Sequence, residues 1–236
     1  MGLNLLALDT STPRAAIALA TPRGIFTHDV PPGSDARHGR TLLPSVRELL
    51  ASIGMAVADL DGFVVGLGPG SYTGLRVGVM AVKTLAFALG KGLAGLDSLE
   101  LIARNAPDDV LRVSVIADAQ RGDLYAADFT RPEVGAALVR SEPTRVVPLT
   151  RWSAELREGS LVLGPGAATN RGQASIPNHA TLLDDPGAHA PDSRRLAELA
   201  VEVWASGRRE DLWFVEPVYL RRSAAEDQWE KLGRPR

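Results

Sequence analysis

Two aspartates follow short apolar runs at positions where a carboxylate could hold the magnesium ion of a nucleotide. Asp9 ends the first run and Asp118 ends a later one. Such a site also needs a turn whose backbone N–H groups reach the phosphates. The turn after Asp9 contains Pro13, which has no N–H, and the turn after Asp118 carries the bulky Gln120 and Arg121. The two carboxylates therefore belong either to a degenerate nucleotide cleft or to turns and helix caps. Efficient ATP turnover is not expected.

Other residues would share this cleft. Ser11 lies in the turn after Asp9, and Gly164 and Gly166 form a Gly-Pro-Gly after the apolar run 161–163. Glycines allow close approach of a backbone or a phosphate. We therefore expect Ser11, Gly164 and Gly166 to lie beside the two aspartates.

The segment 66–78 is a glycine-rich turn that opens a helix. Ser71 or Thr73 can cap that helix, and Arg76 lies in its first turn. Taken alone, the pattern indicates a helix packed closely on a strand. It is not a nucleophile elbow, because Pro69 and Thr73 stand where Gly-x-Ser-x-Gly needs glycines.

A metal site is not expected. The chain has no cysteine and four histidines, and a single imidazole is a poor ligand set. His38 is interpreted as a polar residue at the entry of a helix. The absence of cysteine also fits a reducing cytoplasm.

The elements repeat. Strands at 5–9, 15–20 and 63–66 precede a helix at 75–89; strands at 113–117, 124–129 and 161–163 repeat the order of strand, aspartate, turn and strand, with a later Gly-Pro-Gly. Further helices are predicted at 42–53, 98–102 and 193–206. The sequence predicts two similar α/β lobes, 1–105 and 106–222, with the helix 193–206 able to pack back on the first lobe, and a loosely held tail at 223–236.

Composition restricts the partners. The net charge of −2 over 236 residues argues against a strongly basic RNA-binding surface, because binding tRNA phosphates requires clustered Lys and Arg. No stretch approaches the roughly 20 apolar residues of a spanning helix. We expect contact with RNA only through a partner, and no membrane association.

Several motifs resemble those of one family. The segment 66–78, the opening 6–12, the segment 38–44 and the late motif Pro217–Arg221 resemble landmarks of the TsaB (YeaZ) family. The resemblance is specific from residue 4 to about 105 and looser to 222. It implies an actin-like fold of two ribonuclease-H-like lobes, similar to the catalytic subunit TsaD. TsaD carries a His-x-x-x-His metal site, whereas here Leu42 stands four residues after His38.

The resemblance implies an indirect role. TsaB is a non-catalytic subunit that binds and activates TsaD for N6-threonylcarbamoylation of the tRNA adenosine next to the anticodon, with TsaE joining the pair. It implies no cofactor of its own, weak or absent ATP binding, tRNA contact only through the complex and a possible homodimer of the isolated chain.

The two helices at 42–53 and 75–89 are the candidate interface. The second is apolar on almost every face, which either reflects a central position or leaves one side for a partner. The resemblance favours pairing with the equivalent helices of TsaD or of a second copy. The candidate interface residues are Leu42, Val46, Leu49, Leu50, Thr73, Arg76, Val79, Met80, Lys83 and Leu85.

Three alternatives stay open at this point. The chain could be an independent ATPase or kinase of the actin-like superfold that uses Asp9 and Asp118. It could be a glycoprotease-like peptidase, or a binding module whose glycine-rich loop is only structural.

Overall fold

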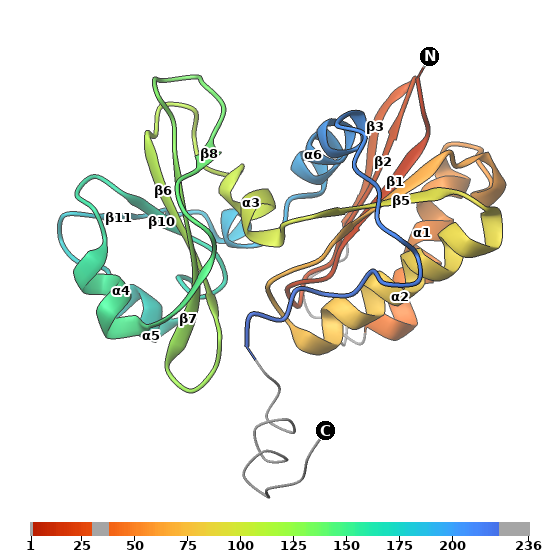
Figure 1. The fold of residues 1–236 in the computed structure, drawn as a ribbon. Helices are drawn as coiled ribbons and strands as arrows, with labels where there is room; N and C mark the ends of the chain where they lie inside the picture. Colours follow the sequence, from red (N-terminus) through yellow and green to blue (C-terminus); the bar gives the residue numbers. More distant parts are fainter. Residues whose placement is uncertain (1, 30–37, 222–236) are drawn as a thin grey trace, which may run out of the picture.

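The computed structural model describes residues 2–29 and 38–221. Two β-sheets lie side by side, with a short helix between them (Figure 1). The first sheet and its helices contain β1 (Leu5–Asp9), β2 (Ala16–Thr21), β3 (Gly24–Asp29), α1 (His38–Ser52), β4 (Gly62–Gly66), α2 (Tyr72–Leu89) and β5 (Gly92–Leu96). A 3₁₀ turn, Val57–Asp59, precedes β4.

The second sheet follows the connecting helix α3 (Ser98–Ala103). Its elements are β6 (Arg112–Asp118), β7 (Asp123–Thr130), β8 (Val139–Arg140), β9 (Arg145–Pro148), α4 (Leu149–Glu155), β10 (Leu161–Leu163), α5 (Asn170–Ala174) and β11 (Thr181–Leu182). A 3₁₀ turn, Pro186–His189, then leads to α6 (Ser193–Ala205).

The two sheets have the same topology. The first runs β3-β2-β1-β4-β5, with antiparallel hairpins through β1 to β3 and parallel pairing of β1, β4 and β5. The second runs β11-β10-β6-β7-β8, with β9 also beside β7, and β6, β10 and β11 parallel. This order is that of a ribonuclease-H-like lobe, and its repetition confirms the predicted fold of two such lobes.

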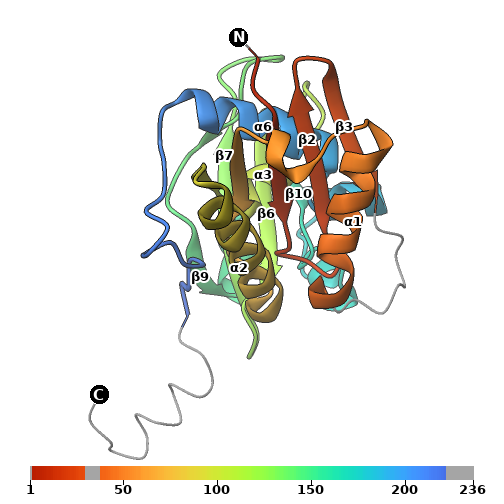
Figure 2. The same ribbon diagram turned by 90° about the vertical axis from the view of Figure 1, so that its right-hand side faces the viewer.

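Helices cover both faces of the first sheet. Strand residues alternate between the faces, so Leu6, Leu8 and Phe63 pack under α1 and α2. Ala7 and Val64 face the opposite side, where they contact α6. Figure 2 shows α1 and α2 in front of the sheet and α6 behind it. We call the first sheet with α1, α2 and α6 the first lobe.

The second lobe is the second sheet with α4 and α5. Trp152 of α4 packs against Ile116 and Val162 on one face. On the other face, Leu99 and Ile102 of α3 pack against Val115 and its neighbours. Leu101 of the same helix belongs to the core of the first lobe. Helix α3 therefore packs on both sheets.

Helix α2 is longer than predicted and has defined ends. Ser71 caps it, because its Oγ accepts the Gly74 amide at 3.2 Å, and Gly90 ends it in a left-handed conformation. By length and composition alone, α2 meets the criteria for a membrane-crossing helix, contrary to the sequence-based expectation that no stretch does. In this structure Leu75, Val79 and Val82 pack on the first sheet.

Candidate functional site

Asp9 lies inside the protein and does not line the cleft between the lobes. Its side chain is fully buried, with Oδ1 accepting the Ser11 amide at 2.8 Å and Oδ2 accepting the Ser98 hydroxyl at 2.6 Å. Burial raises the pKa of the carboxyl above its usual value, and the interactions with Ser11 and Ser98 act in the other direction. The expectation that Asp9 faces a nucleotide cleft is therefore corrected. Its carboxylate fixes the turn after β1 and the start of α3.

Asp118 does line the cleft, but in a turn of its own. Its Oδ1 accepts the Gln120 amide at 2.7 Å, and the turn continues with Gln120 and Arg121 at φ values of 65° and 57°. This region of φ is unfavourable for residues with a Cβ. The turn after Asp118 thus displays two large side chains where a phosphate loop would display backbone N–H groups.

The second Gly-Pro-Gly packs against a strand of its own lobe. Gly164 has a φ of 105°, and its amide donates to His189 Nδ1 at 3.2 Å. The Gly166 amide donates to the Ile116 carbonyl at 2.8 Å, and a Cβ at either glycine would press on that carbonyl. These glycines are needed for close packing on β6, and neither lines the cleft. Their predicted place in a nucleotide site is corrected.

The cleft between the lobes has a volume of about 520 Å³ and mixes aromatic, hydroxyl and arginine side chains. Burial raises the pKa of Tyr125 above its usual value, while Arg221 lowers it and Asp118 raises it further. Ser11 is buried beside the cleft. Its Oγ forms no hydrogen bond with the residues that the structure describes. It lies near enough to Asp9 to favour the charged form of that carboxyl. The cleft is lined by Ser11, Thr12, Pro13, Pro69, Gly70, Ser71, Tyr72, Thr73, Leu99, Ile102, Ala117, Asp118, Ala119, Gln120, Arg121, Tyr125, Pro165, Val218, Tyr219 and Arg221.

The structure divides the candidate interface residues into a buried and an exposed group. Five of them are core residues with at most 4% of their surface exposed, and their predicted place in an interface is corrected: Leu42, Val46, Leu49, Leu50 and Val79. The apolar stripe of α1 packs on the first sheet. Thr73, Arg76 and Met80 are exposed on α2, and Lys83 and Leu85 are half-buried.

Sequence reasoning missed the most exposed aromatic residues on this side of the molecule. Tyr72 and Phe87 of α2 are 42% and 63% exposed, and Trp213 and Phe214 are 73% and 81% exposed. Trp213 contacts Phe87 edge-on, with 5.7 Å between ring centroids. The pairing of a helix with a segment far along the chain leaves no periodicity in the sequence.

That segment, residues 210–221, follows α6 and runs along α2; we call it the C-terminal strap. The Glu210 amide donates to the Leu93 carbonyl at 2.7 Å, and the Val218 amide donates to the Leu67 carbonyl at 2.8 Å. Lys83 Nζ donates to the Trp213 carbonyl at 3.3 Å. The strap is therefore fixed to the first lobe at Glu210, Trp213 and Val218.

Comparison with known proteins decides the family. A TsaB protein of Bacillus subtilis is 31% identical over 231 residues, covering 96% of this chain and 98% of that protein. The Escherichia coli TsaB is 27% identical over 98% of both chains. The chain belongs to the TsaB family.

Other matches agree with this TsaB assignment. Residues 21–147 match the family described as TsaD, tRNA N6-adenosine threonylcarbamoyltransferase. The solved structure of YeaZ from Pseudomonas aeruginosa is 29% identical, has a TM-score of 0.78 and covers 92% of this chain and 100% of its own. A second solved structure, of an uncharacterized protein with similarity to peptidase YeaZ from Pseudomonas aeruginosa, has a TM-score of 0.77 at 30% identity.

Two TsaB landmarks can be located in the fold. His38 is the first residue of α1. Among the described residues, no group of three or more His, Cys, Asp or Glu side chains is placed to hold a metal ion. Pro217–Arg221 forms the end of the C-terminal strap.

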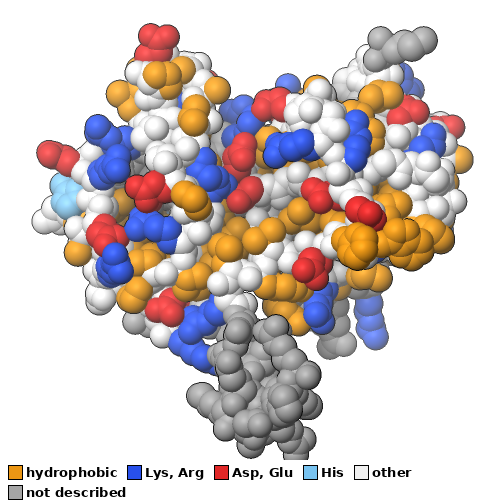
Figure 3. All heavy atoms as spheres, in the orientation of Figure 1, with side chains coloured by type: hydrophobic (Ala, Val, Ile, Leu, Met, Phe, Trp, Pro, Cys, Tyr) orange, Lys and Arg blue, Asp and Glu red, His pale blue; other side chains and the backbone are white. Residues whose placement is uncertain are grey.

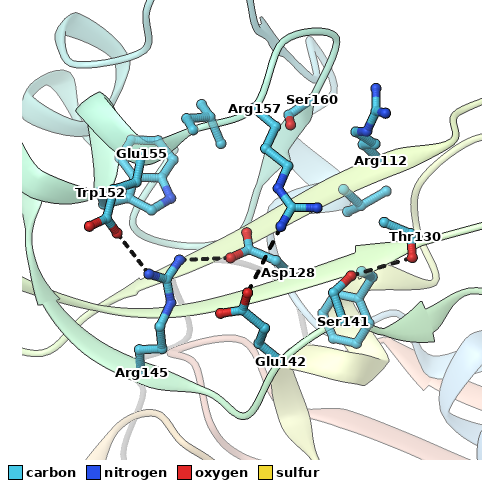
Figure 4. Close-up of a pocket in the computed structure, with 13 residues that line it drawn as sticks. Arg112, Asp128, Thr130, Ser141, Glu142, Arg145, Trp152, Glu155, Arg157 and Ser160 are labelled. Atoms are coloured by element: carbon cyan, nitrogen blue, oxygen red, sulfur yellow. Dashed lines mark hydrogen bonds and ion pairs between the residues drawn. The ribbon is translucent and has the colours of Figure 1, made fainter.

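The second lobe of this TsaB-family chain contains a separate cavity of about 200 Å³ that the sequence did not indicate (Figure 4). Arg145 lies between Asp128 and Glu155, at 2.9 Å from each. Hydrogen bonds from Arg151 and then Arg145 lower the pKa of Glu155. Asp128 lies in β7, Arg145 in β9 and Glu155 in α4, so these ion pairs join the three elements.

Proposed function

We propose that this chain is the non-catalytic partner subunit of a TsaD-type enzyme in the biosynthesis of threonylcarbamoyladenosine in tRNA. The observation that carries the proposal is the match, over nearly the full length of both chains, to proteins named tRNA threonylcarbamoyladenosine biosynthesis protein TsaB. In this role the chain binds TsaD in the cytoplasm and stabilises its active conformation, and TsaE joins the pair. The tRNA is contacted through the complex.

The geometry of the cleft supports a non-catalytic role. Asp9 is enclosed by Ser11 and Ser98, and Asp118 is held in a turn. The backbone of β6 occupies the space beside Gly164 and Gly166. The residue types of an actin-like ATPase site are thus used for packing. This supports weak or absent ATP binding and no cofactor of the chain's own.

The exposed side of α2 supports a protein partner. Met80 and Phe87 are 58% and 63% exposed, and Trp213 of the strap extends the same surface. Figure 3 shows hydrophobic side chains gathered on this side of the first lobe. Clustered large apolar side chains are typical of interaction surfaces. We propose that this surface, rather than α1, meets the related helix of TsaD, or that of a second copy when the chain is alone.

The enzymatic alternatives receive less support from the structure. An independent ATPase or kinase would need Asp9 at the cleft, where it does not lie. A serine peptidase would need an activated Ser71, but the Ser71 Oγ accepts a backbone amide as the cap of α2.

The test is co-purification of this chain with TsaD of the same organism, followed by a tRNA threonylcarbamoylation assay. We expect a complex, and activity only when both chains are present. Phe87→Glu should weaken the complex at least tenfold, whereas the matched control Val201→Glu, an exposed position on α6, should not. Activity of this chain alone, or equal weakening by both variants, would contradict the proposal.

A further inference from the structure

The strap ends on the other lobe. After Val218, which is bonded to Leu67 of the first lobe, the chain continues to Arg221. Figures 1 and 2 both show this segment running along α2 and ending beside the second sheet. The chain itself passes between the lobes at α3 and again at the segment that leads to α6.

Arg221 binds the turn after Asp118. Its Nη1 lies 2.8 Å from the carbonyl oxygens of both Ala119 and Gln120 and 3.0 Å from Asp123 Oδ2. A guanidinium is well suited to several acceptors at fixed angles. Asp123 is the first residue of β7. One side chain from the strap thus holds both the backbone and a carboxylate of the second lobe.

The same turn is conformationally costly. Gln120 and Arg121 both have positive φ, followed by Gly122 at 88°. A residue with a Cβ is disfavoured in this region of φ. This conformation closes the β6–β7 hairpin, in which the Asp123 amide donates to the Gln120 carbonyl at 3.1 Å, and it directs the carbonyl groups of Ala119 and Gln120 at Arg221.

Tyr219 connects the segment Pro217–Arg221 to the N-terminal end of α2. The centroid of its ring lies 5.0 Å from that of Tyr72, and its hydroxyl accepts a hydrogen bond from Arg76 Nε at 3.0 Å. The Arg76 guanidinium also lies over the Tyr72 ring, 4.4 Å from its centroid. Two residues apart in the strap, Tyr219 and Arg221 therefore contact α2 and the second lobe.

We infer that Pro217–Arg221 is a latch between the lobes, which fixes the orientation of the second lobe relative to α2. Arg221 closes the latch, and Tyr219, Tyr72 and Arg76 anchor it. When the latch is open, the second lobe turns about its two chain connections, α3 and the segment that leads to α6, and the cleft widens. A molecule that displaces Tyr219 from α2 would loosen the second lobe.

The isolated chain can test this without any partner, so the result is independent of the proposed function. Because the sequence has no cysteine, Ala51→Cys on α1 and Ala154→Cys on α4 give two exposed, unique sites for spin labels, one on each lobe. Pulsed electron paramagnetic resonance then measures the distribution of distances between the two spin labels, and so between the lobes. The latched protein should give one narrow distribution.

Arg221→Ala should broaden this distribution or add a longer distance, and Arg221→Lys should have a smaller effect. Tyr72→Ala should also broaden it, because it removes the ring under Tyr219. The control is Arg194→Ala, which removes an arginine whose ion pair stays within α6. A distribution unchanged by Arg221→Ala, or broadened equally by the control, would overturn the inference.

Discussion

Asp9 accepts a hydrogen bond from Ser98 at 2.6 Å, although 89 positions separate them in the chain. Asp9 is the last residue of β1 and Ser98 is the first residue of α3. Both side chains are completely buried. The bond therefore connects the central strand of the first lobe to the helix that packs on both sheets, and it gives this carboxylate a structural role.

This buried carboxylate should make stability depend on pH. Its pKa is raised in the folded protein, so the folded state holds the proton more tightly than the unfolded state. The stabilisation linked to this proton is complete below the usual Asp pKa and is lost as the pH rises through the folded pKa. Relative to wild type, Asp9→Asn should therefore be more destabilised at pH 4 than at pH 7. Urea unfolding at both pH values measures the loss of stability. The same loss at pH 4 and at pH 7 would show that Asp9 does not contribute to the pH dependence of stability.

Neighbouring residues on α2 should respond oppositely to a charge. Val79 is 2% exposed and Met80 is 58% exposed. Val79→Glu should lower the free energy of unfolding by about 3 kcal/mol or prevent folding, because it buries an unpaired carboxylate. Met80→Glu should change it by less than about 0.5 kcal/mol and weaken partner binding. Thermal unfolding distinguishes the two; a similar loss from both would mean that Met80 also supports the core.

The turn at Gln120 should be improved by glycine. Gln120 has a φ of 65°, where glycine lacks the steric cost, so Gln120→Gly should stabilise the protein by up to about 1 kcal/mol. The neighbour Ala119→Gly serves as the control and should destabilise by a similar amount, because Ala119 is buried and lies outside this region of φ. Denaturant midpoints of the two variants should move in opposite directions. A loss of stability in both would contradict this account.

Trp204 and Gly62 should be energetically coupled. A Cβ at Gly62 would overlap the Trp204 ring of α6. Gly62→Ala should cost about 1–3 kcal/mol through this overpacking. With Trp204→Phe in the same chain, the added cost of Gly62→Ala should fall by about 1 kcal/mol. A double-mutant cycle measures the coupling; simple additivity would show that the ring moves aside at no cost.

The sequence predicts the fold where apolar runs are continuous. β1, β4 and β6 are buried strands, and α6 has a clear apolar stripe. β5 was missed because Gly92 and Gly95 interrupt its pattern. These glycines are small because Trp204 and Leu67 occupy the space beside them, and this tertiary reason is not visible in a short window.

The candidate site is harder to predict because periodicity shows that a side chain is apolar but not what covers it. Val79 and Met80 both belong to the apolar surface of α2, yet only Met80 is exposed. Likewise, a strand followed by Asp describes both Asp9 and Asp118. One is enclosed by Ser98 from another element, and the other lies at the cleft.

Helix α6 has a consequence for the order of folding during synthesis. It covers one face of the first sheet with Leu196, Leu199 and Val203, but the ribosome makes it after the whole second lobe. Until it emerges, Ala7, Ala18 and Val64 lack the apolar side chains of α6 that cover them. Although domains generally fold in order from the N-terminus, the first lobe of this chain must be completed last. A nascent chain stopped before Ser193 therefore exposes an apolar sheet face to chaperones, with its second lobe already made.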